Sequence, residues 1–403
     1  MSVDVDRLEQ VIRHLAAIPR PSASAGEREA AEWLTGQLRD AGCREARVEE
    51  ERAHGTYWWP LGLLAALGAL GGACALRGGR VRRLAGAMLG GAAAAGLAGE
   101  LGGGSLWFRR AFLPHRSTWN VVAEAGDRDA RETLVVLAHH DAAREGLIYH
   151  PEIPRLIDRL VPSAIIERQK SSPPLLLLVF GGPLLVALGA LLGDRRAVQV
   201  GTAVCGGTVL AMTDLAVRGT VPGANDNLTA VAALIGVAHA LRERPVDGLR
   251  VLLVSCGSEE SLQEGMQGFA RRHFPALPTR HTRVFCLETV GSRDLVCPEC
   301  EGMLVRRSYD AEFKDLTSEC AREAGVELTR GYRLSFASDA LVALRAGYRS
   351  VMIGSLNEYR APANYHWRTD TPENVDYGSV AGAVRLCEAV TRRLAAGAAP
   401  APA

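Results

Sequence analysis

The sequence predicts an α/β fold with a mixed, largely parallel central sheet, flanked by helices and interrupted by two transmembrane helical hairpins. Two observations support this prediction. From residue 221 onward, short apolar segments typical of strands alternate with longer segments of helical spacing, as in parallel sheets covered by helices. Before that point, two pairs of long apolar segments are each joined by a short arginine-containing link, which is typical of membrane hairpins.

The N-terminal part, residues 1–54, is expected to form two helices and an edge strand. Apolar residues recur at helical spacing over 3–18 and 25–41, and residues 44–51 fit a strand. The first 20 residues are charged and lack the early apolar core of a signal peptide.

The two hairpins are expected at residues 55–110 and 173–218. The first apolar segment of each, 57–76 and 173–193, has no charged side chain over roughly the 20 residues that a membrane helix needs. The alternative is a set of buried helices in a soluble core. The leucine-rich segment 173–193 is too uniformly apolar for a helix with one buried face, which favours the membrane.

The remaining parts of the chain are expected to join the N-terminal part in one domain, because each hairpin returns the chain to the side that it left. In the middle part, 111–172, strands are predicted around a turn, followed by a segment of little periodicity at the membrane surface. In the C-terminal part, 219–396, helices and strands alternate, and residues 397–403 are expected to be a disordered tail. The expected strands are 119–124, 133–138, 249–255, 282–287 and 350–353, and the expected helices of the C-terminal part are 228–242, 263–274, 311–324 and 380–395.

The net charge and the cysteines limit the partners and the metal sites that are expected. The chain has 46 Lys and Arg against 45 Asp and Glu, a net charge of +1, which gives no argument for a nucleic-acid partner. The nine cysteines include one Cys-x-x-Cys pair, Cys297 and Cys300, whereas a zinc ribbon usually needs two such pairs. A turn with two free thiols is expected there, with a local disulfide or an extra metal as alternatives.

Residues of the types that bind metals lie at the ends of the predicted strands. Sites in α/β domains form beyond the carboxyl ends of strands, so we expect these side chains to meet. Asp226 lies where a loop turns into a helix, and for an isolated Asn-Asp-Asn an N-cap is the plainer interpretation. The candidates are His139, Asp141, Asp226, Glu259, Glu260, Glu288 and His366.

These residue types suit catalytic zinc, which takes imidazole nitrogen and carboxylate oxygen and keeps a position open for water. Two ions that share a carboxylate can activate a water between them. Asp141 can hold the ring of His139 in the required tautomer. Glu259 and Glu260 are adjacent and point in different directions, so one can bind metal while the other acts as a general base.

The ordered motifs resemble those of the co-catalytic di-zinc aminopeptidase family, peptidase family M28. They are Ala-His-His-Asp, Gly-Ala-Asn-Asp-Asn, Glu-Glu, Leu-Glu-Thr-Val-Gly and His-Trp-Arg-Thr-Asp-Thr. The resemblance covers the N-terminal helices, the strand at 119–122 and nearly everything after residue 221, but neither hairpin and not residues 143–172. It implies a peptidase domain with the zinc-peptidase, phosphorylase/hydrolase-like fold.

The resemblance also implies a role for each candidate. Glu259 would be the general base, and Asp141 would orient His139. Three departures stand out: Glu288 replaces the usual Asp, Ser338-Asp339-Ala340 replaces Ser-Asp-His, and the interval before Asp226 is unusually long. Five residues would ligate two Zn²⁺ ions: His139 and Glu288 hold one, Glu260 and His366 hold the other, and Asp226 bridges both.

The expected function is a membrane-anchored exopeptidase of the aminopeptidase type, with peptides as substrates and the lipid bilayer as partner. The alternatives are a glutaminyl-cyclase-like enzyme with a single Zn²⁺ and an inactive binding protein on the same fold. A transporter is disfavoured, because only Glu100 and Asp214 lie near the apolar segments. By the positive-inside rule, the arginine-containing links favour hairpin tips in the cytoplasm and a catalytic domain outside. Basic residues at the other ends of the hairpins favour the opposite orientation: Arg109, Arg110, Arg116, Arg168 and Lys170.

Overall fold

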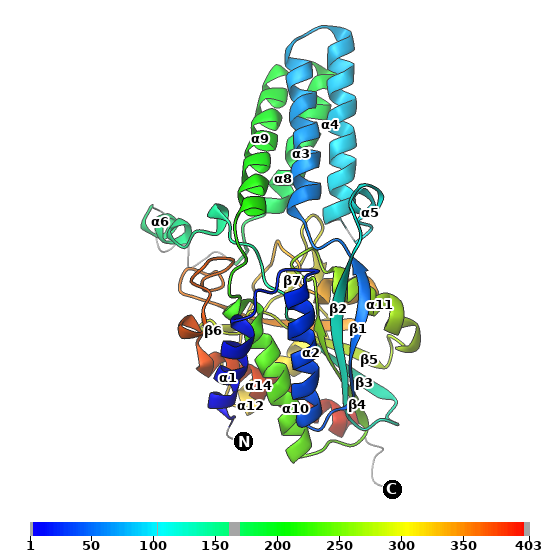
Figure 1. Cartoon of the computed structure of the whole chain (residues 1–403), viewed down its shortest axis with the longest axis vertical. Helices are drawn as coiled ribbons and strands as arrows, with labels where there is room; N and C mark the ends of the chain where they lie inside the picture. Colours follow the sequence, from blue (N-terminus) through cyan, green and yellow to red (C-terminus); the bar gives the residue numbers. More distant parts are fainter. Residues whose placement is uncertain (1–2, 103, 161–169, 399–403) are drawn as a thin grey trace.

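The computed structural model describes residues 3–102, 104–160 and 170–398 of the chain. It has two parts: an upright bundle of long helices and, below it, an α/β domain that contains both termini (Figure 1). The tail expected at 397–403 lies mostly outside the described residues, and the last helix extends to Ala398.

Strands from all three parts of the α/β domain form one eight-stranded sheet, which confirms the predicted fold class. Its order is β1-β2-β4-β3-β5-β10-β6-β9; β3 is parallel to β4 and β5, β10 is parallel to β5, and β6 is parallel to β9. The strands expected at 119–124 and 133–138 form but are not neighbours, because β4 lies between them. The bounds are β1 (Arg44–Ala53), β2 (Arg116–Gly126), β3 (Glu132–His139), β4 (Leu249–Cys256), β5 (Thr282–Leu287), β6 (Asp294–Cys297), β9 (Thr329–Arg330) and β10 (Arg349–Leu356).

Helices cover both faces of this sheet. Successive side chains of a strand point to opposite faces, so a strand that is apolar throughout needs an apolar layer on each side. On β3, Leu134 and Val136 pack into one apolar core, while Val135 and Leu137 pack into the other. The larger core lies under α1 (Val5–Ala16), α2 (Ala25–Asp40), α10 (Thr229–Glu243), α12 (Ala311–Glu323) and α14 (Tyr377–Ala398); the smaller one lies under α11 (Glu264–His273) and α13 (Ala340–Arg345).

Several short elements connect these layers, and the sequence did not predict them. They include a two-stranded sheet of β7 (Cys300–Glu301) and β8 (Arg307–Ser308), the helices α5 (Trp107–Phe112) and α6 (Glu152–Leu160), and the single turns η1 (Leu147–Tyr149), η3 (Phe274–Ala276) and η4 (Pro372–Asn374). Cys297 ends β6 and Cys300 begins β7, and both are free, buried thiols. The two thiols are therefore free, as expected, and a bend lies between them.

The bundle consists of four helices that are long and apolar enough to cross a membrane: α3 (Trp58–Leu76), α4 (Arg80–Leu101), α8 (Leu175–Leu192) and α9 (Arg195–Val217). Small residues let them approach closely, as in membrane helix packing. At Gly90 of α4, a Cβ atom would come within 2.9 Å of backbone atoms of Pro183 and Ala187 in α8. Large apolar side chains face outward instead, among them Leu70, Met88, Leu192 and Leu210.

The base of the bundle packs on loops of the α/β domain. Leu61, Leu97 and Met212 of the bundle share one apolar cluster with Met303 and with the half-buried Leu262 of the domain. Leu262 lies two residues after Glu260, so the bundle rests on the segment that carries two of the candidate site residues.

Candidate metal centre

The sheet brings the candidate residues together at the carboxyl ends of three parallel neighbours. His139 is the last residue of β3 and lies opposite Cys256, the last residue of β4, which Glu259 and Glu260 follow. Glu288 follows directly on β5, the other neighbour of β3. Asp226 and His366 reach the same place from loops. All seven predicted residues lie in one cluster, and none of their side chains is more than 10% exposed.

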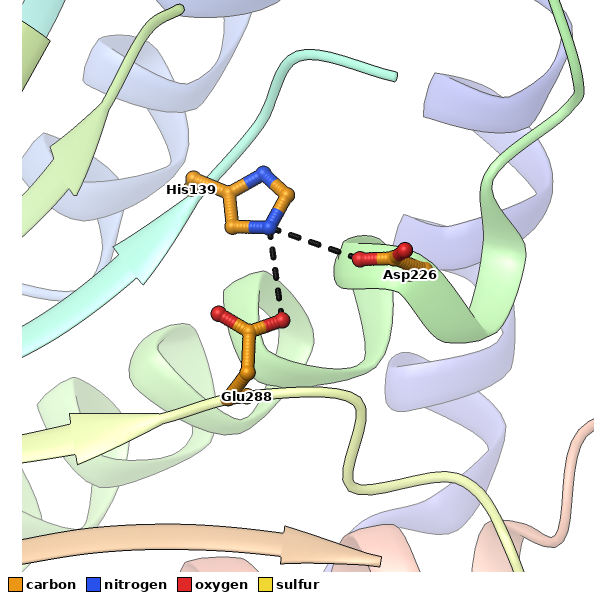
Figure 2. Close-up of side chains that lie close together, drawn as sticks. All are labelled: His139, Asp226 and Glu288. Atoms are coloured by element: carbon orange, nitrogen blue, oxygen red, sulfur yellow. Dashed lines mark ion pairs between the residues drawn. The ribbon is translucent and has the colours of Figure 1, made fainter. Parts of the chain in front are cut away.

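The first half of the cluster is centred on the Nε2 atom of His139 (Figure 2). This nitrogen lies 3.4 Å from Oδ1 of Asp226 and 3.4 Å from Oε1 of Glu288. The longer side chain of Glu288, where the resemblance implies Asp, therefore still reaches the histidine.

The second half is centred on His366. Its Nε2 atom lies 3.0 Å from Oδ2 of Asp226 and 3.2 Å from Oε2 of Glu260. Asp226 thus turns one oxygen to each histidine. Glu259 lies beside the first half, with its Oε2 3.9 Å from Nε2 of His139.

The donor set fits a bound cation. Two trios, His139 with Asp226 and Glu288, and Asp226 with Glu260 and His366, each hold three candidate ligand atoms within 4.8 Å of one another. Two buried carboxylate oxygens here have neither a hydrogen bond nor an ion pair among the described residues: Glu260 Oε1 and Glu288 Oε2. Buried polar groups without partners are costly, and zinc accepts this mixture of imidazole and carboxylate.

Crowding of carboxylates in this buried place shifts their protonation. Burial is the main reason that the pKa of Glu260 is raised to about 7, and the negative charge of Asp226 adds to it against the opposing effect of His366. Burial also raises the pKa of Glu259 well above its ordinary value, and the charge of Glu288 acts in the same direction. Bound cations would offset this accumulation of negative charge.

Asp226 does not cap a helix. Hydrogen bonds made by its two neighbours, Asn225 and Asn227, fix the segment that carries it. Helix α10 begins at Thr229, with Leu228 at the N-cap position and no side-chain cap bond, so the N-cap interpretation is wrong. Asn225 accepts a 2.8 Å hydrogen bond from the N–H of Gly291. Asn227 accepts one of 2.8 Å from the N–H of Thr289. The two asparagines therefore tie the Asp226 segment to the loop that carries Glu288.

Asp141 has two sets of contacts in the site. Its Oδ1 lies 3.3 Å from Nδ1 of His139, the arrangement expected of an orienting carboxylate. It also accepts hydrogen bonds from the backbone N–H groups of Glu259 (3.0 Å) and Glu260 (3.1 Å) and from the hydroxyl of Ser22 (2.7 Å). One carboxylate thus positions residues from β3, from the loop after β4 and from the N-terminal part.

Asp370 supports the site but was not among the predicted residues. It accepts the backbone N–H groups of Asn225 (2.7 Å) and Asp226 (3.1 Å), and burial raises its pKa to about 8. Its place in the motif His-Trp-Arg-Thr-Asp-Thr was the available signal.

Arg20 is a second unpredicted residue, fully buried, and no sequence pattern marked it. It donates to the carbonyl oxygens of His140 (2.7 Å), Pro222 (2.6 Å) and Gly223 (2.8 Å). Gly223 is required beside it, because its φ is +62° and a Cβ atom there would lie 2.8 Å from Nη2 of Arg20.

Aromatic side chains also border the site, and two of them, Tyr149 and Tyr57, lie outside the region of resemblance. The ring of Tyr149 in η1 packs edge-on against His366 with centroids 4.6 Å apart, and Tyr365 stacks on the same ring at 3.8 Å. The hydroxyl of Tyr149 lies 3.3 Å from that of Tyr57, at the start of α3. The membrane-type helix α3 is therefore linked through one tyrosine to His366.

Comparisons with known proteins give one family model and a shared fold. Residues 209–391 match the model of Peptidase family M28. No curated protein sequence gives a match. Many solved structures share the fold, at identities low enough that the likeness concerns the fold alone.

Three of these structures illustrate the likeness. A leucine aminopeptidase precursor from Bacteroides thetaiotaomicron has a TM-score of 0.56 at 12% identity, with 97% of this chain and 98% of that chain covered. An aminopeptidase from Aneurinibacillus sp. strain AM-1 has 0.53 at 13%, with 96% and 93% covered. A glutaminyl cyclase from B. thetaiotaomicron has 0.55 at 12%, with 97% and 98% covered. The resemblance to peptidase family M28 is thereby confirmed, by the family model over residues 209–391 and by the shared fold over nearly the whole chain.

Proposed function

We propose that the chain is a membrane-anchored, zinc-dependent exopeptidase of the aminopeptidase type. The observation that carries this proposal is the placement of Asp226, whose Oδ1 faces His139 and whose Oδ2 faces His366. A carboxylate with one oxygen toward each ligand set suits a bridge between two ions. His139 and Glu288 would hold one Zn²⁺, and Glu260 and His366 the other. When bound, the pair would polarise the scissile carbonyl and lower the pKa of the attacking water.

Glu259 is the residue that we assign as general base. One of its oxygens accepts a 2.9 Å hydrogen bond from the side-chain amide of Gln263, which fixes the carboxylate. The other oxygen faces His139. In the proposed reaction Glu259 takes a proton from the attacking water and returns it to the leaving amine nitrogen. Asp141 holds both the ring of His139 and the backbone of Glu259 in place for this transfer.

A glutaminyl-cyclase-like activity with a single Zn²⁺ is the second candidate. Glutaminyl cyclases from B. thetaiotaomicron and Tannerella forsythia are among the similar structures. The two complete ligand trios favour two ions and hydrolysis instead.

The test is metal removal and restoration on purified protein with an unblocked peptide. A chelator should abolish the release of N-terminal residues, and Zn²⁺ should restore it. Glu259→Gln should lower the turnover by at least about 10²-fold with metal content unchanged. Full activity of Glu259→Gln with normal metal content would remove Glu259 as the base. Cyclisation of N-terminal glutamine without any release of residues would favour the second candidate.

We also propose that the four apolar helices cross the bilayer as two hairpins. Support comes from α6, whose apolar side chains repeat at helical spacing and are all at least 42% exposed: Ile153, Leu156, Ile157 and Leu160. In Figure 1 this helix projects sideways at the level of the bundle base, where a bilayer surface would lie. The arginines of the links at 77–83 and 194–196 would lie at the cytoplasmic tips, with the catalytic domain outside.

Labelling of an engineered cysteine tests this orientation. Arg80→Cys at the hairpin tip should react with a membrane-impermeant maleimide only after the cells are opened. Reaction with intact cells would place the tip outside and the catalytic domain in the cytoplasm. The unaltered chain gives the background from its native cysteines, of which Cys74 alone among the described residues is half-buried and the others are buried.

A further inference from the structure

A hollow of about 290 Å³ lies beside the base of the bundle, and none of the seven residues of the metal centre lines it. Basic side chains converge on it from separate segments of the chain. They are Arg52 and His54 from the end of β1 and just after it, Arg110 from α5, His115 from the segment before β2 and Arg271 from α11.

The carboxylate in the lining, Glu264, makes its close contacts with groups other than the three arginines of the hollow. It accepts the backbone N–H groups of His54 (2.9 Å) and Gly55 (3.0 Å) and lies 3.4 Å from the guanidinium of the buried Arg109. Although burial acts in the opposite direction, the charge of Arg109 and the bonds from His54 lower the pKa of Glu264 to about 2. Glu264 thus belongs to an internal group with Arg109, which also binds Glu100 at 2.6 Å.

Two of the three arginines of the hollow, Arg52 and Arg110, have no ion pair among the described residues. Arg110 contacts the side-chain oxygen of Gln267 at 3.1 Å. Arg271 lies 3.7 Å from Glu51, which Arg272 already binds at 2.6 Å. Like charges gathered in a concave site repel one another, and an anion between them removes that cost.

A buried polar atom beside these arginines lacks a partner. His54 is 5% exposed, and its Nδ1 lies 2.7 Å from Glu264. Its Nε2 has no hydrogen-bond partner among the residues described in the structure. The ring packs against that of His115, with centroids 4.9 Å apart. Buried ring nitrogens are normally satisfied, so this atom points to a ligand of the hollow.

The position of the hollow indicates where the ligand comes from. Arg110 lies in α5, which follows directly on α4 and sits at the base of the bundle (Figure 1). Trp107 and Phe112 of the same helix are 44% and 68% exposed. Exposed aromatic side chains at the end of a membrane helix typically lie among the lipid headgroups.

We propose that this hollow binds a phosphate-type anion between Arg52, Arg110 and Arg271, with the phosphodiester headgroup of an anionic lipid as its expected source. Guanidinium groups bind phosphate oxygens in pairs, and binding at the base of the bundle would fix the α/β domain against the bilayer. The proposal rests on the membrane placement of the bundle and not on the peptidase activity.

The test measures lipid binding to the full chain in detergent micelles, by native mass spectrometry and by the shift of the melting temperature. The probes are phosphatidylglycerol, phosphatidylcholine and inorganic phosphate. Arg110→Gln/Arg271→Gln removes two charges from the hollow. Arg7→Gln/Arg128→Gln is the matched control, since it removes two exposed arginines of the α/β domain that lie outside both the hollow and α6. Arg52→Gln, a single exposed residue, is the second variant if the double variant does not fold.

The parent and the control should bind phosphatidylglycerol in preference to phosphatidylcholine, and the hollow variant should bind it at least about tenfold more weakly. If inorganic phosphate alone stabilises the parent, and the hollow variant loses this stabilisation, the site is instead assigned to a free anion. If the parent, the control and the hollow variant all bind phosphatidylglycerol equally and all bind inorganic phosphate equally, the proposal is overturned. Release of N-terminal residues is measured on the same samples, so that failure of the proposed peptidase function is recognised separately.

Discussion

The carboxylate of Asp141 accepts a 3.0 Å hydrogen bond from the backbone N–H of Glu259. The same carboxylate contacts the ring of His139, so the proposed general base and a proposed zinc ligand share one support. Asp141 follows β3 and Glu259 follows β4. These strands are parallel neighbours, so their pairing sets the distance between the two residues. The sheet therefore sets the relative positions of the proposed base and the proposed zinc ligand.

Asp141→Asn should separate positioning from metal binding. The amide keeps the size of the side chain but replaces one acceptor oxygen with a donor, which opposes the N–H group of either Glu259 or Glu260, since each bonds a different oxygen. We expect turnover to fall by roughly 10- to 100-fold. The measurement is kcat with metal content on the same sample. Asp129→Asn, at an exposed loop position, is the matched control and should leave kcat unchanged.

Arg20→Met should destabilise the domain without touching the metal ligands. Methionine fills much of the space but leaves the carbonyl oxygens of His140, Pro222 and Gly223 without their donor. Because these carbonyls are buried, we expect a loss of roughly 3 kcal/mol in unfolding free energy. Thermal unfolding in detergent measures it, with Arg7→Met on the exposed face of α1 as control. An unfolding midpoint equal to that of the control would show that Arg20 does not hold the Asp226 loop.

Stability should fall in acid because of Glu264. Its folded-state pKa of about 2 lies below the ordinary value of 4.5, so the carboxylate stabilises the fold above pH 4.5. This stabilisation, at most about 3 kcal/mol, is lost as the pH falls from 4.5 towards 2. Glu264→Gln should lower the unfolding midpoint at pH 7 and flatten its dependence on pH in the acid range. An unchanged acid profile in the variant would contradict the assignment to Glu264.

Close packing of the bundle gives a further prediction. Gly90 has no room for a larger side chain, because backbone atoms of α8 lie 2.9 Å from the position of its Cβ. Gly90→Leu should push α4 and α8 apart and lower the unfolding midpoint, whereas Gly91→Leu faces open space and should be tolerated. The pair is compared by thermal unfolding in the same detergent. Equal midpoints would show that α4 and α8 do not pack as described.

Periodicity and chain order predicted much of this molecule. The α/β fold, the four apolar helices and the seven candidate residues all follow from local patterns and ordered motifs. The amphipathic helix α6 was missed although Ile153, Leu156, Ile157 and Leu160 repeat at helical spacing, because the surrounding prolines obscured a nine-residue pattern. The domain division at residues 55, 111, 173 and 219 stays a prediction.

The supports of the site were beyond prediction for a physical reason. Arg20 binds carbonyl oxygens more than 100 residues away, and such partners exist only once the sheet has formed. The order of β2, β4 and β3 is likewise a tertiary result, since consecutive strands in the chain look like a hairpin. The conformation of Asp226 also depends on Asp370, which reaches it from a distant loop.

Zinc content and product analysis on one sample test the central claim, a metal pair bridged by Asp226, most directly. Purified protein should hold two zinc ions per chain and release the N-terminal residue of an unblocked peptide, and Asp226→Ala should lose both properties. One zinc ion per chain, together with cyclisation of N-terminal glutamine and no release of residues, would contradict it.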